Sequence, residues 1–138
     1  MAREFSISFP GGACVDAACG DLVIRTDQPV SGGGNGSAPT PFDLFLASLG
    51  TCAGIYVLSF CRQRGLPTDD IRIVERVEMD GETHLVSEVT LEIQLPADFP
   101  EKYAPALIRA ADLCAVKRHL EHPPAINVVT KAVEPLGV

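Results

Sequence analysis

Residues 40–67 read TPFDLFLASLGTCAGIYVLSFCRQRGLP, and this stretch carries the signals of one long helix. Thr40 is a typical N-cap residue, Pro41 suits the first helical position, and Asp43 can complete a capping box. The end of the helix is marked by cations, a glycine and a proline, at Arg62, Arg64, Gly65 and Pro67. The stretch therefore predicts a helix that begins after Thr40 and stops near Gly65.

The predicted helix is apolar on every side, which constrains how it can be buried. Its apolar residues include Leu44, Phe45, Leu46, Leu49, Ile55, Tyr56, Val57 and Leu58. A chain of 138 residues has little material to enclose such a helix, so we expect a second copy to cover it in an obligate homodimer. Residues 42–60 also have the length of a membrane span, but polar residues and glycines interrupt them. We therefore expect a core helix and no membrane partner.

Alternating patterns and turn signals predict strands on both sides of the helix. The expected strands cover residues 4–9, 13–18, 22–26, 70–79, 85–95 and 126–133, and a second helical region covers residues 101–120. The glycine-rich residues 27–40 predict a flexible connection. The order is three strands, helix, two strands, helix, strand, in a single domain over residues 1–138. This order indicates an α+β fold with a mostly antiparallel sheet.

Composition restricts the possible partners and the compartment. The chain has 11 Lys and Arg against 18 Asp and Glu, and its net charge of −7 repels phosphate backbones and anionic membrane surfaces. We therefore expect no nucleic-acid binding. The first residues alternate apolar and polar types, unlike a secretory signal, and the five cysteines lack the spacing of a disulfide framework. These features predict a cytoplasmic protein with free thiols.

Two cysteines lie where a thiol could be used. Cys52 is in the middle of the predicted helix, between small residues that allow close approach to the backbone. Cys114 is in the second helical region, and Lys117 and Arg118 follow it by three and four positions, on the same helical face. The thiolate is the reactive form, and burial in an apolar helix raises the pKa of Cys52, so a reactive Cys52 needs a cation from elsewhere. Each cysteine alone is also compatible with a small core residue.

No metal site is expected. Cys114, His119 and His122 are the nearest approach to a cluster of metal ligands, but a short helical segment that ends at Pro123 holds three ligands poorly.

Two motifs resemble the OsmC/Ohr superfamily. Residues 38–52 (APTPFDLFLASLGTC) are similar to the helix motif that leads to its first active cysteine, and residues 111–116 (ADLCAV) are similar to its second cysteine motif. The order of strands and helices agrees as well. The resemblance implies an intertwined homodimer around long buried helices, with two sites at the subunit interface that each pair Cys52 with Cys114.

The resemblance also implies a chemistry. In the enzymatic members one cysteine attacks an organic hydroperoxide and becomes a sulfenic acid, which the other cysteine resolves as a disulfide. A dithiol such as a lipoyl group then restores the thiols, and no bound cofactor is needed. On this resemblance Cys52 attacks and Cys114 resolves. The implied substrate pocket contains Phe42, Asp43, Phe45, Leu49 and Thr51.

The chain departs from the best-studied peroxidases of the superfamily at the residues that stabilise their thiolate. Residues 10–16, where those enzymes carry an Arg, contain none, and Phe42 stands in place of the paired Glu. Ala115 replaces the Pro that usually follows the second cysteine. The candidate replacement cations are Arg25, Lys117 and Arg118. Two functions therefore stay open: a thiol-dependent reductase of organic hydroperoxides, and a non-catalytic dimer that binds a small apolar or electrophilic ligand.

Overall fold

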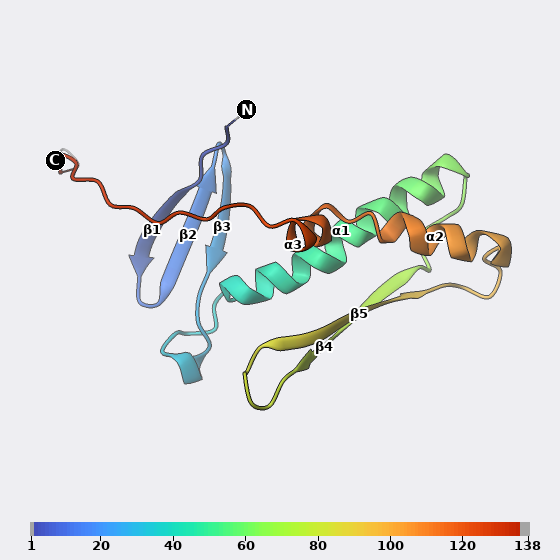
Figure 1. Cartoon of the computed structure of the whole chain (residues 1–138), viewed down its shortest axis with the longest axis horizontal. Helices are drawn as coiled ribbons and strands as arrows, with labels where there is room; N and C mark the ends of the chain where they lie inside the picture. The colour runs from blue at the N-terminus through green and yellow to red at the C-terminus, as the bar shows by residue number, and fades with distance from the viewer. Residues whose placement is uncertain (1, 136–138) are drawn as a thin grey trace.

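The computed structural model describes residues 2–135 and contains two antiparallel sheets and three α-helices over that range (Figure 1). The strands are β1 (Ser6–Gly11), β2 (Cys14–Cys19), β3 (Leu22–Thr26), β4 (Arg72–Met79) and β5 (Val86–Gln94). The helices are α1 (Pro41–Gln63), α2 (Ala104–Ala111) and α3 (Ala115–Glu121), with 3-10 turns at Val30–Gly32 and Glu101–Tyr103. Strands β1, β2 and β3 form one sheet and β4 and β5 form the other, so the predicted α+β class is confirmed.

Helix α1 begins and ends where the sequence signals predict. Thr40 Oγ1 accepts a hydrogen bond from the Asp43 backbone N–H at 3.1 Å, and the Asp43 carboxylate accepts one from the Thr40 N–H at 3.3 Å. These two hydrogen bonds satisfy backbone N–H groups at the start of the helix, which have no carbonyl partner within it. Beyond Gln63, Gly65 adopts a left-handed φ of +66°, which residues with a Cβ rarely adopt, and the helix stops.

Replacing Thr40 with Ala is expected to lower the free energy of unfolding by about 1 kcal/mol, because the Asp43 N–H loses its acceptor. Urea denaturation at a fixed protein concentration measures the change. Thr40→Ser is the matched control, since it keeps the accepting oxygen and should recover most of the loss. Equal stability of all three proteins would contradict this assignment of the cap.

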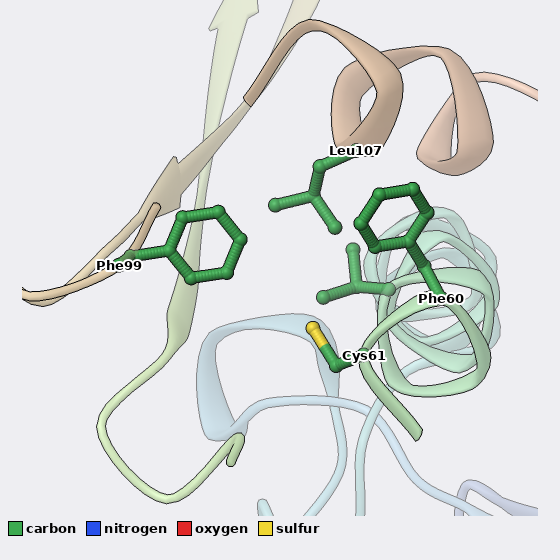
Figure 2. Close-up of a cluster of buried hydrophobic side chains, with 5 residues drawn as sticks. Phe60, Cys61, Phe99 and Leu107 are labelled. Atoms are coloured by element: carbon green, nitrogen blue, oxygen red, sulfur yellow. The ribbon is translucent and has the colours of Figure 1, made fainter. Parts of the chain in front are cut away.

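One face of α1 packs against the β4–β5 hairpin and α2 to form the core. The buried residues of this face recur at helical spacing and are Leu49, Ala53, Val57, Phe60 and Cys61. Figure 2 shows Phe60 and Cys61 meeting Leu107, which comes from α2, and Phe99, which follows β5. This packing holds the middle of α1, and with it Cys52, against α2 and the hairpin.

The opposite face of α1 is open in the single chain, so the prediction of a buried helix is correct for one face only. Ile55 and Phe42 on this helix are 54% and 50% exposed. By length and mean hydropathy α1 could cross a membrane, but one such helix is weak evidence for a span because soluble core helices pass the same test.

Two elements differ from the prediction. The predicted closing strand is wrong for the single chain: residues 126–133 belong to no strand, and Ile126 and Val128 are 85% and 93% exposed. A strand forms by hydrogen bonding to a neighbour, and no other strand within residues 2–135 pairs with this segment. The second helical region is divided into α2 and α3, because Cys114 leaves the helical conformation at φ −45° and ψ 123°.

The glycine-rich stretch between β3 and α1 is an ordered loop, contrary to the prediction of a flexible connection. Asp27, which is 1% exposed, lies at its centre. Its carboxylate accepts hydrogen bonds of 2.6–3.3 Å from the N–H groups of Gln28, Asn35 and Ser37 and from the Ser37 hydroxyl. These donors, led by the Ser37 hydroxyl, hold the pKa of Asp27 well below that of an ordinary aspartate. The bonds fold the loop back on itself and fix the approach to Thr40.

Candidate active site

Cys52 and Cys114 are far apart in the sequence and lie beside each other in the structure. Cys52 is half-buried in the middle of α1, and Cys114 is buried at the break between α2 and α3. The break directs the Cys114 Sγ toward α1, where it lies 4.0 Å from the carbonyl oxygen of Leu49. The two thiols are close enough to affect each other's ionisation. The structure thus brings together the two residues that the motifs singled out.

Backbone N–H groups at the start of α3 stabilise the thiolate of Cys52. The N–H of Val116 is the largest cause that lowers the pKa of Cys52, and partial burial opposes it. The Cys114 thiol and the N–H of Ala115 lower the pKa further. Because a thiolate accepts hydrogen bonds and a thiol accepts them weakly, these donors favour the ionised form. Cys52 therefore has the lowered pKa that a nucleophilic thiol needs.

Cys114 has the opposite character. Burial is the main cause that raises the pKa of its thiol, and its position next to Cys52 raises it further. Burial also raises the pKa of Cys61, which belongs to the core. All five cysteines are free thiols in the structure. The pair therefore combines a thiol of lowered pKa with one of raised pKa.

The structure assigns the stabilisation of Cys52 to groups other than the predicted cations. Within residues 2–135, neither Arg25, Lys117 nor Arg118 is among the groups that shift its pKa. Arg25 lies on β3, opposite Asp16 of the neighbouring strand. Lys117 forms an ion pair with Asp112. In the single chain, the largest cause that lowers the pKa of Cys52 is the Val116 amide of α3, which sequence reasoning missed because no side chain marks it.

The predicted substrate pocket is only partly assembled in the single chain. Phe42 and Asp43 are exposed at the start of α1, where the Phe42 ring lies 5.5 Å from that of Phe45. Thr51 is exposed, and its hydroxyl donates to the carbonyl of Ala47 at 3.0 Å. Of the five predicted pocket residues, Leu49 alone lines a cavity, and that cavity lies on the hairpin side of the helix.

This cavity has a volume of about 490 Å³ and lies between α1, the β4–β5 hairpin and helices α2 and α3. Its walls are mostly apolar and include Leu49, Leu91, Ile93 and Leu107. Cys114 lines it as well, whereas Cys52 does not. The sequence offered one signal for the cavity: the strict alternation of apolar residues along β5, which gives that strand one apolar face.

The nucleophilicity of Cys52 should persist to lower pH than that of an ordinary thiol with a pKa of about 8.5. We expect the rate of alkylation of Cys52 by iodoacetamide, followed by peptide mass mapping, to fall with decreasing pH at a midpoint below that value. Ala115→Pro removes one donor at a helical position that tolerates proline, so its midpoint should move upward. Ala115→Gly keeps the N–H and is the matched control. Equal midpoints in the two variants would contradict the role of this amide.

The family assignment comes from comparison with known proteins. The OsmC-like protein family matches residues 33–129. A search of curated proteins finds no match. A putative osmotic stress induced and detoxification response protein from Psychrobacter arcticus is 23% identical, with a TM-score of 0.70 over 83% of this chain and 85% of that one.

Two more distant structures share the fold. The OsmC-like protein of Mycoplasma pneumoniae is 11% identical, with a TM-score of 0.68 over 89% of each chain. The organic hydroperoxide resistance protein OhrB of Bacillus subtilis is 20% identical, with a TM-score of 0.53 over 86% of this chain and 90% of that one. Such identities show the fold alone, whereas the family match spans most of the sequence. This chain therefore belongs to the OsmC-like protein family, in the OsmC/Ohr superfamily.

Proposed function

We propose that this protein reduces organic hydroperoxides with the thiols of Cys52 and Cys114. The observation that carries the proposal is that Cys52, whose pKa is lowered, lies close enough to Cys114, whose pKa is raised, for the two thiols to affect each other. Similar structures from Legionella pneumophila and Bacillus subtilis are named organic hydroperoxide resistance proteins, which supports this substrate class. A cytoplasmic location fits the proposal, because a reducing compartment keeps the cysteines as thiols.

The reaction proceeds in two steps. The Cys52 thiolate attacks one peroxide oxygen, the O–O bond breaks, and the alkoxide leaves as an alcohol after taking a proton. Cys52 is then a sulfenic acid. The sulfur of Cys114 loses its proton and attacks the sulfur of Cys52, hydroxide leaves as water, and a disulfide forms. A dithiol, such as a lipoyl group, returns both cysteines to thiols and is itself oxidised to a disulfide.

A second copy of the chain completes the site. Phe42, Phe45 and Thr51 lie on the part of α1 that is open in the single chain, near Cys52 in the sequence. Exposed apolar residues also occur on β1 and in the segment after α3, where Phe9 and Val128 are 81% and 93% exposed. So much open apolar surface is unusual in a stable monomer. We therefore assign these surfaces to the interface of a homodimer, in which residues 126–133 gain the pairing that they lack here.

Sedimentation velocity measures this association directly. We expect a single species with the mass of a dimer at micromolar concentration, because the unpaired apolar surface should make the separate chain unstable. Val128→Lys places a charge in the proposed interface and should shift the distribution toward monomer or unfolded chain. Lys131→Arg, in the same segment, is the control and should leave the dimer intact. A stable folded monomer of the unmodified protein would overturn the assignment.

The second candidate function is a dimer that binds a small apolar or electrophilic ligand without catalysis. The apolar cavity of about 490 Å³ is the observation that favours it, since cavities of this size and character are typical of ligand sites. On this alternative the thiols need not react with peroxide at any useful rate.

Counting free thiols separates the two functions. One equivalent of cumene hydroperoxide per chain is added to the reduced protein, and the remaining thiols are titrated after denaturation. The reductase should lose two thiols per chain rapidly and regain them with dihydrolipoamide. If the protein loses its thiols only as slowly as free cysteine reacts with the same peroxide, the reductase function is excluded and the binding function remains.

A further inference from the structure

Cys114 has two different neighbours on its two sides. Cys114 lies close enough to Cys52 for the two thiols to affect each other's ionisation, and it also lines the apolar cavity, which Cys52 does not line. The cavity is bordered by the β4–β5 hairpin and by the helices α1, α2 and α3. The exposed part of α1 that precedes Cys52 contributes only Leu49 to it. A molecule in the cavity therefore lies next to Cys114 and not next to Cys52.

We propose that the cavity is the entry site of the reducing dithiol, and that this dithiol attacks the sulfur of Cys114 in the oxidised protein. The inference rests on the proposed function, because it needs the Cys52–Cys114 disulfide. It adds a separation of the two substrates: the hydroperoxide meets Cys52 on the side of α1 that the second copy completes, and the reductant meets Cys114 on the cavity side.

The chemistry of the exchange favours this direction. A thiolate of the reductant attacks the Cys114 sulfur, the bond between Cys114 and Cys52 breaks, and Cys52 leaves as a thiolate. The leaving thiolate is stabilised by the N–H groups of Val116 and Ala115, and a thiol of lower pKa leaves faster. The second thiol of the reductant then loses its proton. It attacks the first sulfur of the reductant, which is bonded to Cys114 in the mixed disulfide. Cys114 is released as a thiolate and takes up a proton, and the reductant becomes a cyclic disulfide.

The walls of the cavity indicate the kind of dithiol that fits. They are aliphatic along Leu91, Ile93 and Leu107, which suits a reductant carried on a hydrocarbon arm. Lys117 and Asp112 also line the cavity and are paired with each other. An alkyl dithiol therefore fits better than a small polar thiol.

The attacked sulfur can be identified without any peroxide. Diamide oxidises the protein to the Cys52–Cys114 disulfide, 1-butanethiol is added, and the reaction is quenched with acid for peptide mass mapping. We expect the butyl adduct on Cys114 and a free thiol at Cys52. An adduct on Cys52 would overturn the inference, and so would failure of diamide to link the two cysteines. If diamide forms the disulfide and cumene hydroperoxide does not, the proposed peroxide reduction fails while this inference stands.

The preference for an apolar thiol tests the cavity itself. The rates at which 1-butanethiol and 2-mercaptoethanol attack the disulfide of the oxidised protein are measured. Each rate is divided by the rate of the same thiol with oxidised glutathione, which corrects for the difference in intrinsic reactivity between the two thiols. We expect the normalised rate for 1-butanethiol to be roughly tenfold higher, as burial of a short alkyl chain implies. Val89→Phe narrows the cavity and should abolish this preference. Thr90→Phe adds the same bulk at an exposed neighbouring position and should retain it. Entry through the cavity would be contradicted if the unmodified protein showed no preference for 1-butanethiol. It would also be contradicted if Val89→Phe and Thr90→Phe showed the same preference.

Discussion

Cys52→Ser should abolish the rapid loss of thiols that cumene hydroperoxide causes in the unmodified protein. A serine hydroxyl is a far weaker nucleophile than a thiolate, and Cys52 is a partly exposed thiol of lowered pKa. Cys114→Ser should behave differently. It keeps the attacking thiol, so it should lose one thiol quickly and hold Cys52 as a sulfenic acid that dimedone traps.

The comparison has a matched control in Cys14→Ser, which changes a thiol on β2 away from the pair. This variant should lose two thiols at the rate of the unmodified protein. Stopped-flow thiol titration after denaturation gives all four time courses. Rapid loss in Cys52→Ser, or equal behaviour of Cys52→Ser and Cys114→Ser, would contradict the separate roles of the two cysteines.

Gly34→Ala should lower the free energy of unfolding by about 3 kcal/mol, the upper part of the range for a side chain forced into a filled space. A Cβ on Gly34 would lie 2.1 Å from the backbone oxygen of Gln28 and 2.5 Å from the carboxylate of Asp27. Neither atom can give way easily, since Asp27 is held by several hydrogen bonds. The substitution therefore opens the loop that leads into α1.

Gly32→Ala is the control for this loop. Its Cβ would meet only Pro29 and Gln28 side-chain atoms at 3.4 Å or more, which is ordinary contact. Urea denaturation of both variants at the same protein concentration measures the difference. We expect Gly32→Ala to stay within about 1 kcal/mol of the unmodified protein. Equal destabilisation by the two substitutions would show that the loop is not closed around Asp27.

The sequence predicted best those features whose causes are local. The capping box of Thr40 and Asp43 and the glycine at position 65 act within one helical turn, so α1 was placed correctly at both ends. The alternation of apolar residues along β5 likewise identified its hairpin with β4. In each case the signal and the structure that it produces lie within a few residues of each other.

Features that depend on distant partners were missed. Asp27 orders its loop through Asn35 and Ser37, which lie eight and ten positions away, and nothing at position 27 alone marks this role. Residues 126–133 have the composition of a strand, yet a strand also needs a neighbour to bond with, and no strand among the described residues pairs with this segment.

The active site combines both kinds of feature. Motifs identified Cys52 and Cys114, but the group that stabilises the Cys52 thiolate is a backbone amide at Val116. Any residue except proline carries such a donor, so its position depends on the break between α2 and α3 rather than on residue type. This explains why reasoning from side chains turned to Arg25, Lys117 and Arg118, none of which is among the groups that shift the pKa of Cys52 in the single chain.

Peptide mass mapping after a single turnover identifies the cysteines that the hydroperoxide joins. The reduced protein receives one equivalent of cumene hydroperoxide, remaining thiols are alkylated in denaturant, and the digest is analysed without reductant. We expect one major cross-linked species, in which the peptide with Cys52 is joined to the peptide with Cys114. Alkylated Cys52 and Cys114 in the product, or a disulfide that joins either of them to another cysteine, would contradict this expectation.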